Sequence, residues 1–400
     1  MQSRRVFISK VATSLAGGLA ANASAAGSAN VRIRIGLIGA GDRGKEILRE
    51  AMGCPGVECA GIADVYPRRL EEARTIAPSA ASYADYRALL DDKSVDAVLI
   101  ATPQHLRGEP FLAALGAGKH IYLEKAMALT VAEAKNMRAA WQPSGRTVQI
   151  GHQWTSSGQM ADAAAFLKPE LMGKIFTIRA HMYRNTPHGK PQGTRPVYPD
   201  MTAENIAWPA FLGEAPPHPF DANRFVNWRS YWDYSGGAVQ EHMCQQVAFW
   251  YKALGLQIPS AVTMTGGLYV WKDGRQTPDT MHVSMELPEE LLFTWDSGFA
   301  NDKLGTGEEA LGSDGTISRG QQIRYAPQKV NRPQGNEMSG RTLTPPRAHM
   351  QNFFDCARTG QEPNCPVELG YRVAVACRMA VESYRLGRTV RWNAEKEEIV

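Results

Sequence analysis

An acid and a base stand side by side in the stretch "HIYLEKAMALT", residues 120–130, where an apolar run would normally give way to turn residues. Charged groups at the tip of a buried strand are unfavourable unless that tip uses them. A lysine amine held there could transfer a proton to or from a hydroxyl group. We therefore take Lys125 as a candidate catalytic residue and Glu124 as a group that faces the same crevice. The alternative is a surface ion pair.

A glycine-rich turn follows the first apolar run, in "VRIRIGLIGAGDRG", residues 31–44. The order of strand, GxGxxG turn and helix is the context that a dinucleotide-binding motif requires. Gly39 permits the tight turn, Gly41 lets the backbone approach a pyrophosphate, and Gly44 lets the helix pack closely on the strand. The anion would lie at the helix N-terminus, beside Arg43. The turn therefore predicts a bound dinucleotide.

A second strand, "VECAGIAD", ends in Asp64, twenty residues after Gly44. An acid at this spacing accepts hydrogen bonds from the adenosine ribose and disfavours a 2′-phosphate, which favours NAD. Arg68 and Arg69 follow closely, so NADP is not excluded.

Further apolar runs alternate with helical stretches and place other polar residues at strand ends. The runs are 96–103, 119–125 and 147–152. Near-continuous apolar strands of this kind form a parallel sheet covered by helices, and ligands bind outside its carboxyl ends. We predict a doubly wound Rossmann domain of the α/β class over residues 31–150. Its remaining cofactor contacts are predicted at Thr102, Pro103, His105, Glu124, Lys125 and Gln153.

From residue 151 the pattern changes to strict alternation, as in "IFTIRAHMY" (175–183) and "TMHVSMEL" (280–287). A period of two is typical of an antiparallel sheet with one face in a core. Residues 151–400 are therefore predicted to form an α+β domain with a large, open, mostly antiparallel sheet. Within it, 300–346 should form hairpins and loops, and 367–386 a core helix.

The segment "RFVNWRSYWDYSGG", residues 224–237, is dense in aromatic rings with a few polar groups. Such surfaces suit the apolar faces and hydroxyl rims of sugars, although aromatic residues also serve simply as core. The predicted substrate-binding residues are His152, Tyr183, Arg229, Trp232, Tyr234 and Gln245.

The glycine motif, the acid-tipped second strand, "ATPQH" and "LEKAMALT" together resemble the glucose–fructose oxidoreductase/inositol dehydrogenase family (Gfo/Idh/MocA). The family signature EKP is replaced here by Glu124-Lys125-Ala126. The resemblance implies an NAD(P)-dependent oxidoreductase that acts on a sugar, a sugar derivative or a cyclitol. It also implies a homo-oligomer that buries the open face of the second sheet.

The helix after the Gly-Gly pair departs from that family's pattern. The resemblance implies an acid, a histidine and an aspartate at the fourth, eighth and eleventh positions after the second glycine. This chain has Glu241, Gln245 and Ala248, with His242 about one turn before the glutamine. A glutamine can hydrogen-bond a hydroxyl but cannot take its proton. Glu241 and His242 are therefore candidate catalytic residues beside Lys125.

Residues 1–25 are predicted to be a cleaved export signal, followed by a linker at 26–30. A charged start is followed by a mild apolar run, shorter than the roughly 18 residues of a membrane span. The pair Arg4-Arg5, with Phe7 close behind, resembles a twin-arginine signal. We expect a periplasmic or otherwise exported protein that meets the twin-arginine machinery during export. An ordinary secretory leader is the alternative.

Composition argues against some partners. The 400 residues carry a formal net charge of +4, of which three positive charges lie in the first 25 residues. The near-neutral remainder gives no reason to expect a nucleic-acid partner. Six cysteines form no pair or cluster with metal-binding spacing, so no metal is predicted and isolated buried thiols are expected.

Export constrains the chemistry, because no NAD pool exists outside the cytoplasm. A cofactor carried across with the folded protein would be tightly bound and would return to its starting redox state. One chemistry passes a hydride from one sugar to another. The alternative is an NAD-dependent glycoside hydrolase that oxidises, eliminates, hydrates and reduces. A third reading is a non-catalytic carbohydrate-binding protein.

Overall fold

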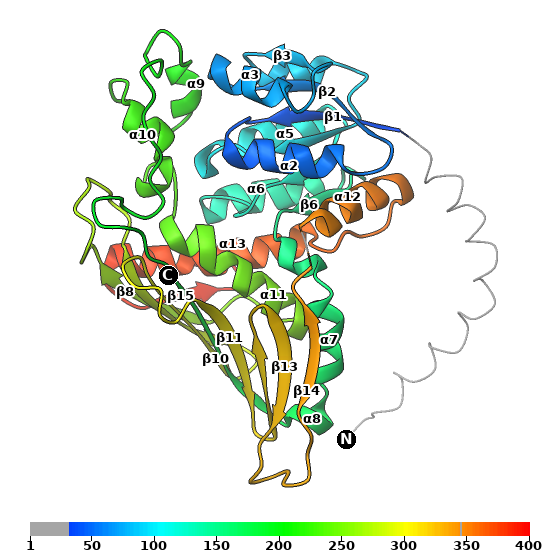
Figure 1. Cartoon of the computed structure of the whole chain (residues 1–400), viewed down its shortest axis with the longest axis vertical. Coiled ribbons are helices and arrows are strands. Elements are labelled where there is room, and N and C mark those ends of the chain that lie inside the picture. Colours follow the sequence, from blue (N-terminus) through cyan, green and yellow to red (C-terminus); the bar gives the residue numbers. More distant parts are fainter. Residues whose placement is uncertain (1–31, 345) are drawn as a thin grey trace, which may run out of the picture.

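The computed structural model describes residues 32–344 and 346–400. The predicted signal at 1–25 and the linker at 26–30 lie outside the described residues. Two sheets organise the chain, one above the other in Figure 1. The α/β prediction for the first half and the α+β prediction for the second are both confirmed.

The first sheet is parallel and has six strands in the order β3-β2-β1-β4-β5-β6. Its strands are β1 (Ile33–Ile38), β2 (Val57–Ala63), β3 (Ala81–Tyr83), β4 (Ala97–Ile100), β5 (His120–Leu123) and β6 (Val148–Ile150). β1, β4 and β6 are buried along nearly their whole length. Strands buried on both faces require helices on both sides, and these follow each strand.

The first-domain helices are α2 (Asp42–Met52), α3 (Pro67–Arg74), α4 (Tyr86–Asp91), α5 (Gly108–Gly116) and α6 (Val131–Trp141). The start of α6 has a sequence explanation, since the Glu133 N–H donates to Thr130 Oγ1 at 3.1 Å. The Glu133 carboxylate accepts from the N–H of Leu129 and of Gly108. These caps satisfy backbone groups that the helix termini would otherwise leave unpaired.

The second sheet has ten strands in the order β14-β13-β12-β11-β7-β10-β9-β8-β15-β16. Its neighbours are antiparallel except for β7 and β10, which run parallel. The strands are β7 (Ile175–Tyr183), β8 (Ala261–Gly267), β9 (Thr280–Leu287), β10 (Leu291–Gly298), β11 (Thr306–Gly312), β12 (Gly315–Arg319), β13 (Gln322–Pro327), β14 (Met338–Thr342), β15 (Val390–Asn393) and β16 (Glu398–Ile399).

One face of this sheet packs against helices and the other is open. Burial alternates along β9, as the period of two predicted. The covering helices, α11 and α13, lie between the two sheets in Figure 1. The remaining helices are α7 (Gln159–Phe166), α8 (Pro169–Met172), α9 (Trp208–Leu212), α10 (Ala222–Val226), α11 (Cys244–Leu254), α12 (Arg347–Thr359) and α13 (Val367–Leu386). Short 3₁₀ turns lie at Gln104–Leu106, Gln153–Ser156 and Trp228–Ser230, and a π-helical turn, Val239–Met243, leads into α11.

Helix α12 belongs to the second half of the chain but packs on the first sheet. Met350, Phe353 and Phe354 share a core cluster with Ile35 and Leu99. The chain therefore returns to its first domain after completing the second sheet.

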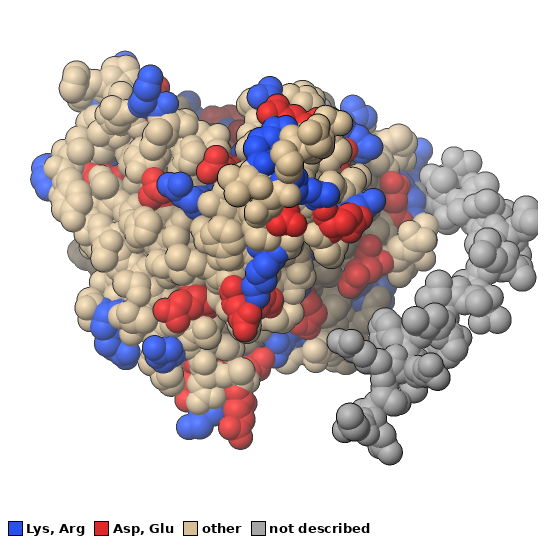
Figure 2. Space-filling view, turned by 90° about the horizontal axis from the view of Figure 1, so that it is seen from below, with Lys and Arg blue, Asp and Glu red and all other residues tan. Residues whose placement is uncertain are grey.

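The surface agrees with the near-neutral charge. In Figure 2, basic and acidic side chains are interspersed among larger uncharged areas on the face shown. All six cysteines are buried and unpaired, as expected. Among the described residues, no helix is long and apolar enough to cross a membrane.

Candidate active site

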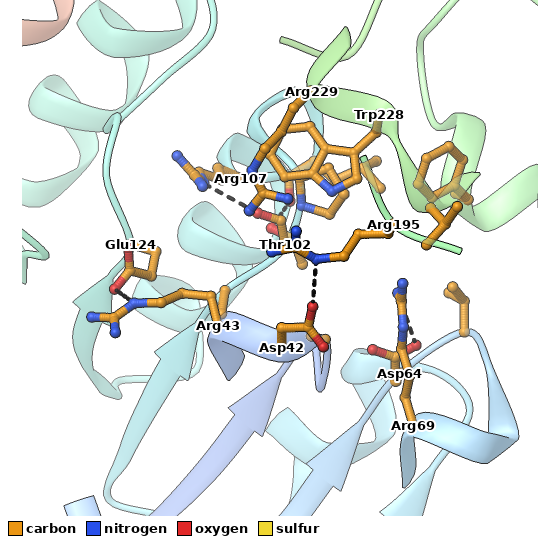
Figure 3. A pocket seen from close by; sticks show the side chains of 18 of the residues that line it. Asp42, Arg43, Asp64, Arg69, Thr102, Arg107, Glu124, Arg195, Trp228 and Arg229 are labelled. Atoms are coloured by element: carbon orange, nitrogen blue, oxygen red, sulfur yellow. Dashed lines mark hydrogen bonds and ion pairs between the residues drawn. The ribbon is translucent and has the colours of Figure 1, made fainter. Parts of the chain in front are cut away.

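A cleft of about 1150 Å³ lies at the carboxyl ends of the first sheet, and the second domain forms its opposite wall. Its lining combines the glycine turn, the ends of β2, β4 and β5, and the start of the helix that contains α11. Figure 3 shows the labelled side chains converging from both domains. The volume is large for a single small molecule, which suits a dinucleotide with a substrate beside it.

Steric limits on the glycine turn fit a dinucleotide. Gly39 has φ +90°, and a Cβ there would lie 2.9 Å from the backbone carbon of Ala101. A Cβ on Gly44 would lie 2.0 Å from the carbonyl oxygen of Gly39, so the helix could not pack on the turn. By contrast, a Cβ on Gly41 would meet only the Arg69 guanidinium, at 3.9 Å. Gly41 thus leaves open space above the N-terminus of α2, where a phosphate would bind.

Asp64 stands at the end of β2 and lines the same cleft. Its Oδ2 accepts from the Ala40 N–H at 2.7 Å, and its Oδ1 from the Tyr66 N–H at 3.0 Å. Burial raises the pKa of this carboxyl, while Arg69, 3.9 Å away, opposes the shift. The two backbone bonds fix the orientation of the carboxylate at the end of β2.

Glu124 braces the glycine turn rather than the lysine ammonium. Its Oε1 accepts from Arg43 Nε at 2.8 Å, the contact drawn at the left of Figure 3, and from Gln153 Nε2 at 3.3 Å. Its Oε2 accepts from the Lys125 backbone N–H at 3.3 Å. Only 2% of Glu124 is exposed, so Arg43 compensates a buried charge. Gln153 reaches Glu124 without lining the cleft.

The Lys125 amine lies in the cleft at the tip of β5. Its Nζ donates to the Glu241 carbonyl oxygen at 2.8 Å and to Glu241 Oε2 at 3.2 Å. The Lys125–Ala126 peptide bond is cis, at the position where the family signature has proline. Arg107 fixes this turn, because its guanidinium donates to the carbonyl oxygens of Ala126 and Thr102.

Glu241 is the anionic centre of the substrate end. Besides Lys125, it accepts from Arg229 Nε at 3.0 Å and from Gln104 Nε2 at 2.6 Å. Burial opposes ionisation, but Lys125 and Arg229 hold the pKa of this carboxyl well below its usual range. A carboxylate held in this way is a weak proton acceptor. Its geometry suits it to positioning the lysine.

His242 lines the cleft next to Glu241, with its ring edge-on to Phe299 at 6.2 Å between centroids. Burial, reinforced by Arg184 and Lys125, lowers the pKa of His242 to about 3. The imidazole is therefore neutral at ordinary pH and can accept a hydrogen bond from a hydroxyl.

Gln245 lines the cleft, and the predicted substrate contact His152 supports it from behind. Gln245 Oε1 lies 3.2 Å from His152 Nδ1, and its Nε2 donates to Gln153 Oε1 at 3.1 Å. His152 is fully buried, which lowers the pKa of its imidazole to about 3, and does not line the cleft. We assign it a supporting position, not a contact.

Four other predicted site residues lie away from the cleft wall because neighbouring side chains enclose them. His105 packs between Phe211 and Tyr234, and its Nε2 lies 2.8 Å from the Phe211 carbonyl oxygen. Tyr234 is fully buried and its hydroxyl lies 2.6 Å from His218 Nε2. Trp232 packs at a tilt against Tyr384, and the Tyr183 ring packs over Gly298. Trp232 and Tyr234 therefore pack in the interior instead of facing the cleft. Arg229, Gln245, Thr102 and Pro103 do line the cleft.

Two contacts at the substrate end were missed from the sequence. Gln104 bonds Glu241 and accepts from the Gly236 N–H at 3.0 Å, joining the domains. Arg107 holds the lysine turn. Gln104 lies within "ATPQH" and Arg107 two residues after it, so their closeness to the end of β4 is the sequence feature that indicates a place in the site.

A segment of the second domain, residues 184–207, crosses the dinucleotide end of the cleft. Arg195 Nε donates to Asp42 Oδ2 at 2.8 Å, the central contact of Figure 3. Asp200 accepts from the Tyr66 hydroxyl at 2.6 Å and from Arg68 Nη1 at 3.1 Å. The 184–207 segment is thus fastened to the glycine turn at Asp42 and to the residues after β2 at Tyr66 and Arg68. No sequence motif indicated this.

A family model described as "Oxidoreductase family, NAD-binding Rossmann fold" matches residues 33–152. Over these residues the chain is similar to the Gfo/Idh/MocA family. The family match covers the glycine turn, Asp64 and Lys125, and it agrees with the steric fit of the cleft to a dinucleotide.

Several curated proteins are similar to this chain. Inositol 2-dehydrogenase from Salmonella typhimurium is 34% identical over 122 residues, 30% of this chain and 36% of that protein. Inositol 2-dehydrogenase from Arthrobacter sp. is 25% identical over 372 residues, 90% of this chain and 95% of that protein. 2,7-Anhydro-N-acetylneuraminate hydratase from Escherichia coli is 26% identical over 220 residues, 53% of this chain and 48% of that protein. The chain spans only 36% to 41% of the length of several other curated relatives.

Among solved structures, levoglucosan dehydrogenase in complex with NADH and levoglucosan superposes with a TM-score of 0.69 at 19% identity. The match covers 90% of this chain and 99% of that one. At this identity the likeness establishes the two-domain fold.

Proposed function

We propose that the protein is an NAD(P)-dependent oxidoreductase that acts on a sugar, a sugar derivative or a cyclitol, with proton transfer assisted by Lys125. The observation that carries the proposal is the position of the Lys125 amine. It lies inside the cleft at the carboxyl end of β5, within 3.2 Å of Glu241, and the glycine turn lines the same cleft.

The residues divide the work. The glycine turn and Asp64 would hold the pyrophosphate and ribose, and a bound nicotinamide would exchange a hydride with a carbinol carbon of the substrate. Lys125 Nζ exchanges the hydroxyl proton with the substrate, which loses it during oxidation and regains it during reduction. Glu241 holds that amine in place, and the neutral imidazole of His242 can accept a hydrogen bond from a substrate hydroxyl on the same wall.

Tight cofactor binding is part of the proposal. The 184–207 segment would have to leave Asp42 and the Tyr66–Arg68 side before a dinucleotide could dissociate. The Asp64 carboxylate favours NAD, because it would repel a 2′-phosphate.

Export would make the overall reaction redox-neutral. An exported enzyme that keeps one nucleotide must return it to its starting state, for example by oxidising one sugar and reducing another.

We also propose a homo-oligomer that covers the open face of the second sheet, which light scattering would test through the particle mass in solution. Secretion of a fusion carrying residues 1–30, and its loss when Arg4 and Arg5 become Lys, tests twin-arginine export.

A second candidate function is redox-neutral glycoside hydrolysis. It is favoured by the similarity to a hydratase of an anhydro sugar. Elimination of the glycosidic substituent needs a second base to remove the C–H proton beside the transient carbonyl, and the lowered pKa values of Glu241 and His242 make both weak bases for that step.

Three measurements separate the candidates. Release of NAD from the purified, denatured protein supports either enzyme and excludes the non-catalytic carbohydrate-binding reading. Formation of oxidised and reduced products from mixed sugars supports the oxidoreductase. Release of nitrophenol from nitrophenyl glycosides, without net sugar oxidation, supports the hydrolase instead.

A further inference from the structure

The wall that the second domain contributes to the cleft carries an excess of positive charge. Its charged side chains are Arg184, Arg195, Arg229, Arg275 and Glu241. Four guanidinium groups thus accompany one carboxylate. A cleft built only for an uncharged polyol has no need of such an excess, so each arginine requires an account.

Two of the four arginines are neutralised within the protein. Arg195 pairs with Asp42 at 2.8 Å, at the dinucleotide end. Arg275 pairs with Asp273 at 2.8 Å and also donates to a backbone carbonyl oxygen. Neither has charge to spare for a substrate.

The next arginine is neutralised only in part. Arg229 Nε and Lys125 Nζ share one carboxylate oxygen of Glu241, at 3.0 and 3.2 Å. Two cations therefore face one anion, and Gln104, the third group on Glu241, is uncharged. One positive charge is left over beside the lysine.

Arg184 has no side-chain hydrogen bond or ion pair with any residue of 32–344 or 346–400. Only its backbone N–H is engaged, with the Gly298 carbonyl oxygen at 3.0 Å. It follows β7 and lines the cleft near His242, whose pKa it helps to lower. This places Arg184 at the substrate end, away from the glycine turn. It is therefore not explained by the charge of a dinucleotide.

The backbone adds to this positive field. Gly237 and Ala238, which begin the helix leading into α11, line the same end of the cleft. The N-terminal end of a helix carries partial positive charge, which favours an anion nearby. Arginine is also the side chain best matched to a carboxylate, because its planar fork donates two parallel hydrogen bonds.

We infer that the substrate is a sugar that carries a carboxylate, such as a uronic acid, and that Arg184, assisted by Arg229, binds this group. The inference rests on the proposed function and narrows its substrate class. Arg184 determines specificity and takes no part in proton or hydride transfer.

The test compares uronates with their parent aldoses on the purified holoenzyme. Glucuronate and glucose, galacturonate and galactose, and mannuronate and mannose differ only in the carboxylate at C6. Single-turnover reduction of the bound nucleotide, followed by absorbance at rising sugar concentration, gives for each sugar a half-saturating concentration (here KM) and a limiting rate constant (here kcat). We expect a KM at least about tenfold lower for one uronate than for its parent aldose, a preference that added salt weakens.

Arg184→Gln should remove that preference. The uronate KM should rise about tenfold, while kcat and the KM for the parent aldose stay within about twofold. The matched control is Arg391→Gln, which removes an exposed arginine of β15 outside the cleft. The control should keep the uronate preference.

Three outcomes would overturn the inference: equal KM values for uronate and aldose, an R184Q variant that keeps the preference, or no reaction with any uronate. If neutral aldoses reduce the bound nucleotide as well as uronates do, the proposed oxidoreductase activity holds and the proposed carboxylate site is wrong. If the purified chain holds no nucleotide, the oxidoreductase fails separately. Calorimetric titration with the same sugar pairs still decides whether Arg184 binds a carboxylate.

Discussion

At the dinucleotide end of the cleft, the glycine turn, residues 39–44, supplies the groups that would meet the phosphates. At the substrate end, by contrast, Lys125, Glu241, Arg229 and Gln104 come from four separate segments. Backbone sterics limit which residues the dinucleotide end can accept, since a Cβ on Gly44 would lie 2.0 Å from the carbonyl oxygen of Gly39. The balance of charged side chains limits which residues the substrate end can accept. Changes at the two ends should therefore fail in different ways.

The largest contrast should come from the lysine. Lys125→Ala removes the proton carrier, so turnover should fall by about two to four orders of magnitude while nucleotide content is unchanged. Steady-state rates and the nucleotide released on denaturation measure the two effects. Turnover within threefold of the wild type would remove Lys125 from the mechanism.

Within the dinucleotide end, two glycines form a matched pair. Gly44→Ala should destabilise the fold by about 2–3 kcal/mol and abolish nucleotide binding, because its Cβ meets backbone oxygen. Gly41→Ala meets only a side chain and should fold normally with weaker nucleotide binding. Thermal unfolding and nucleotide content distinguish them. Equal stability losses would contradict the steric argument.

At the substrate end, buried His152 should make stability depend on pH. Burial holds its folded pKa at about 3, below the ordinary value of 6.5. The unfolded chain therefore takes up a proton that the folded chain refuses, so this contribution is complete above about pH 6.5 and is lost as the pH falls toward 3. His152→Gln should lower the slope of unfolding free energy against pH by about 1.4 kcal/mol per unit between pH 6 and 4. Urea unfolding at several pH values measures the slope, and an unchanged slope would contradict the assignment.

The smallest effect should come from the 184–207 segment. The Arg195–Asp42 pair is solvent-exposed, and exposed ion pairs contribute less than about 1 kcal/mol. Arg195→Ala should speed nucleotide release about threefold, and adding Asp200→Ala should speed it about tenfold. Stopped-flow displacement by excess nucleotide gives the rates. If the double variant releases nucleotide at the wild-type rate, the segment does not retain the cofactor.

The elements with a strong local signal were predictable from the sequence. The glycine turn, the second strand and the core helix, α13 at Val367–Leu386, lie where the patterns placed them. A short strand, β3, escaped notice because three partly exposed residues, Ala81–Tyr83, show no period. Local patterns report backbone preference, and β3 exists only because β2 offers it a partner.

The candidate site was predictable where a strand end or a family spacing determined it. Lys125 is expected from its place at a strand end, and Glu241 from the acid that the family resemblance implies four positions after Gly237. The structure brings the two within hydrogen-bonding distance. Trp232 and Tyr234 were chosen for residue type, yet aromatic side chains fill a core as readily as a sugar site. The partnership of Gln104 with Glu241 spans 137 positions and has no local signature.

Helix α12 determines how the nucleotide-binding domain can be fused to another protein. Met350, Phe353 and Phe354 complete a hydrophobic layer beneath the parallel strands, although they come some two hundred residues after β6. A fragment cut at residue 150 would leave that layer open to water and prone to aggregation. A successful graft should splice residues 347–359 back onto it, or replace the surface they cover with polar side chains.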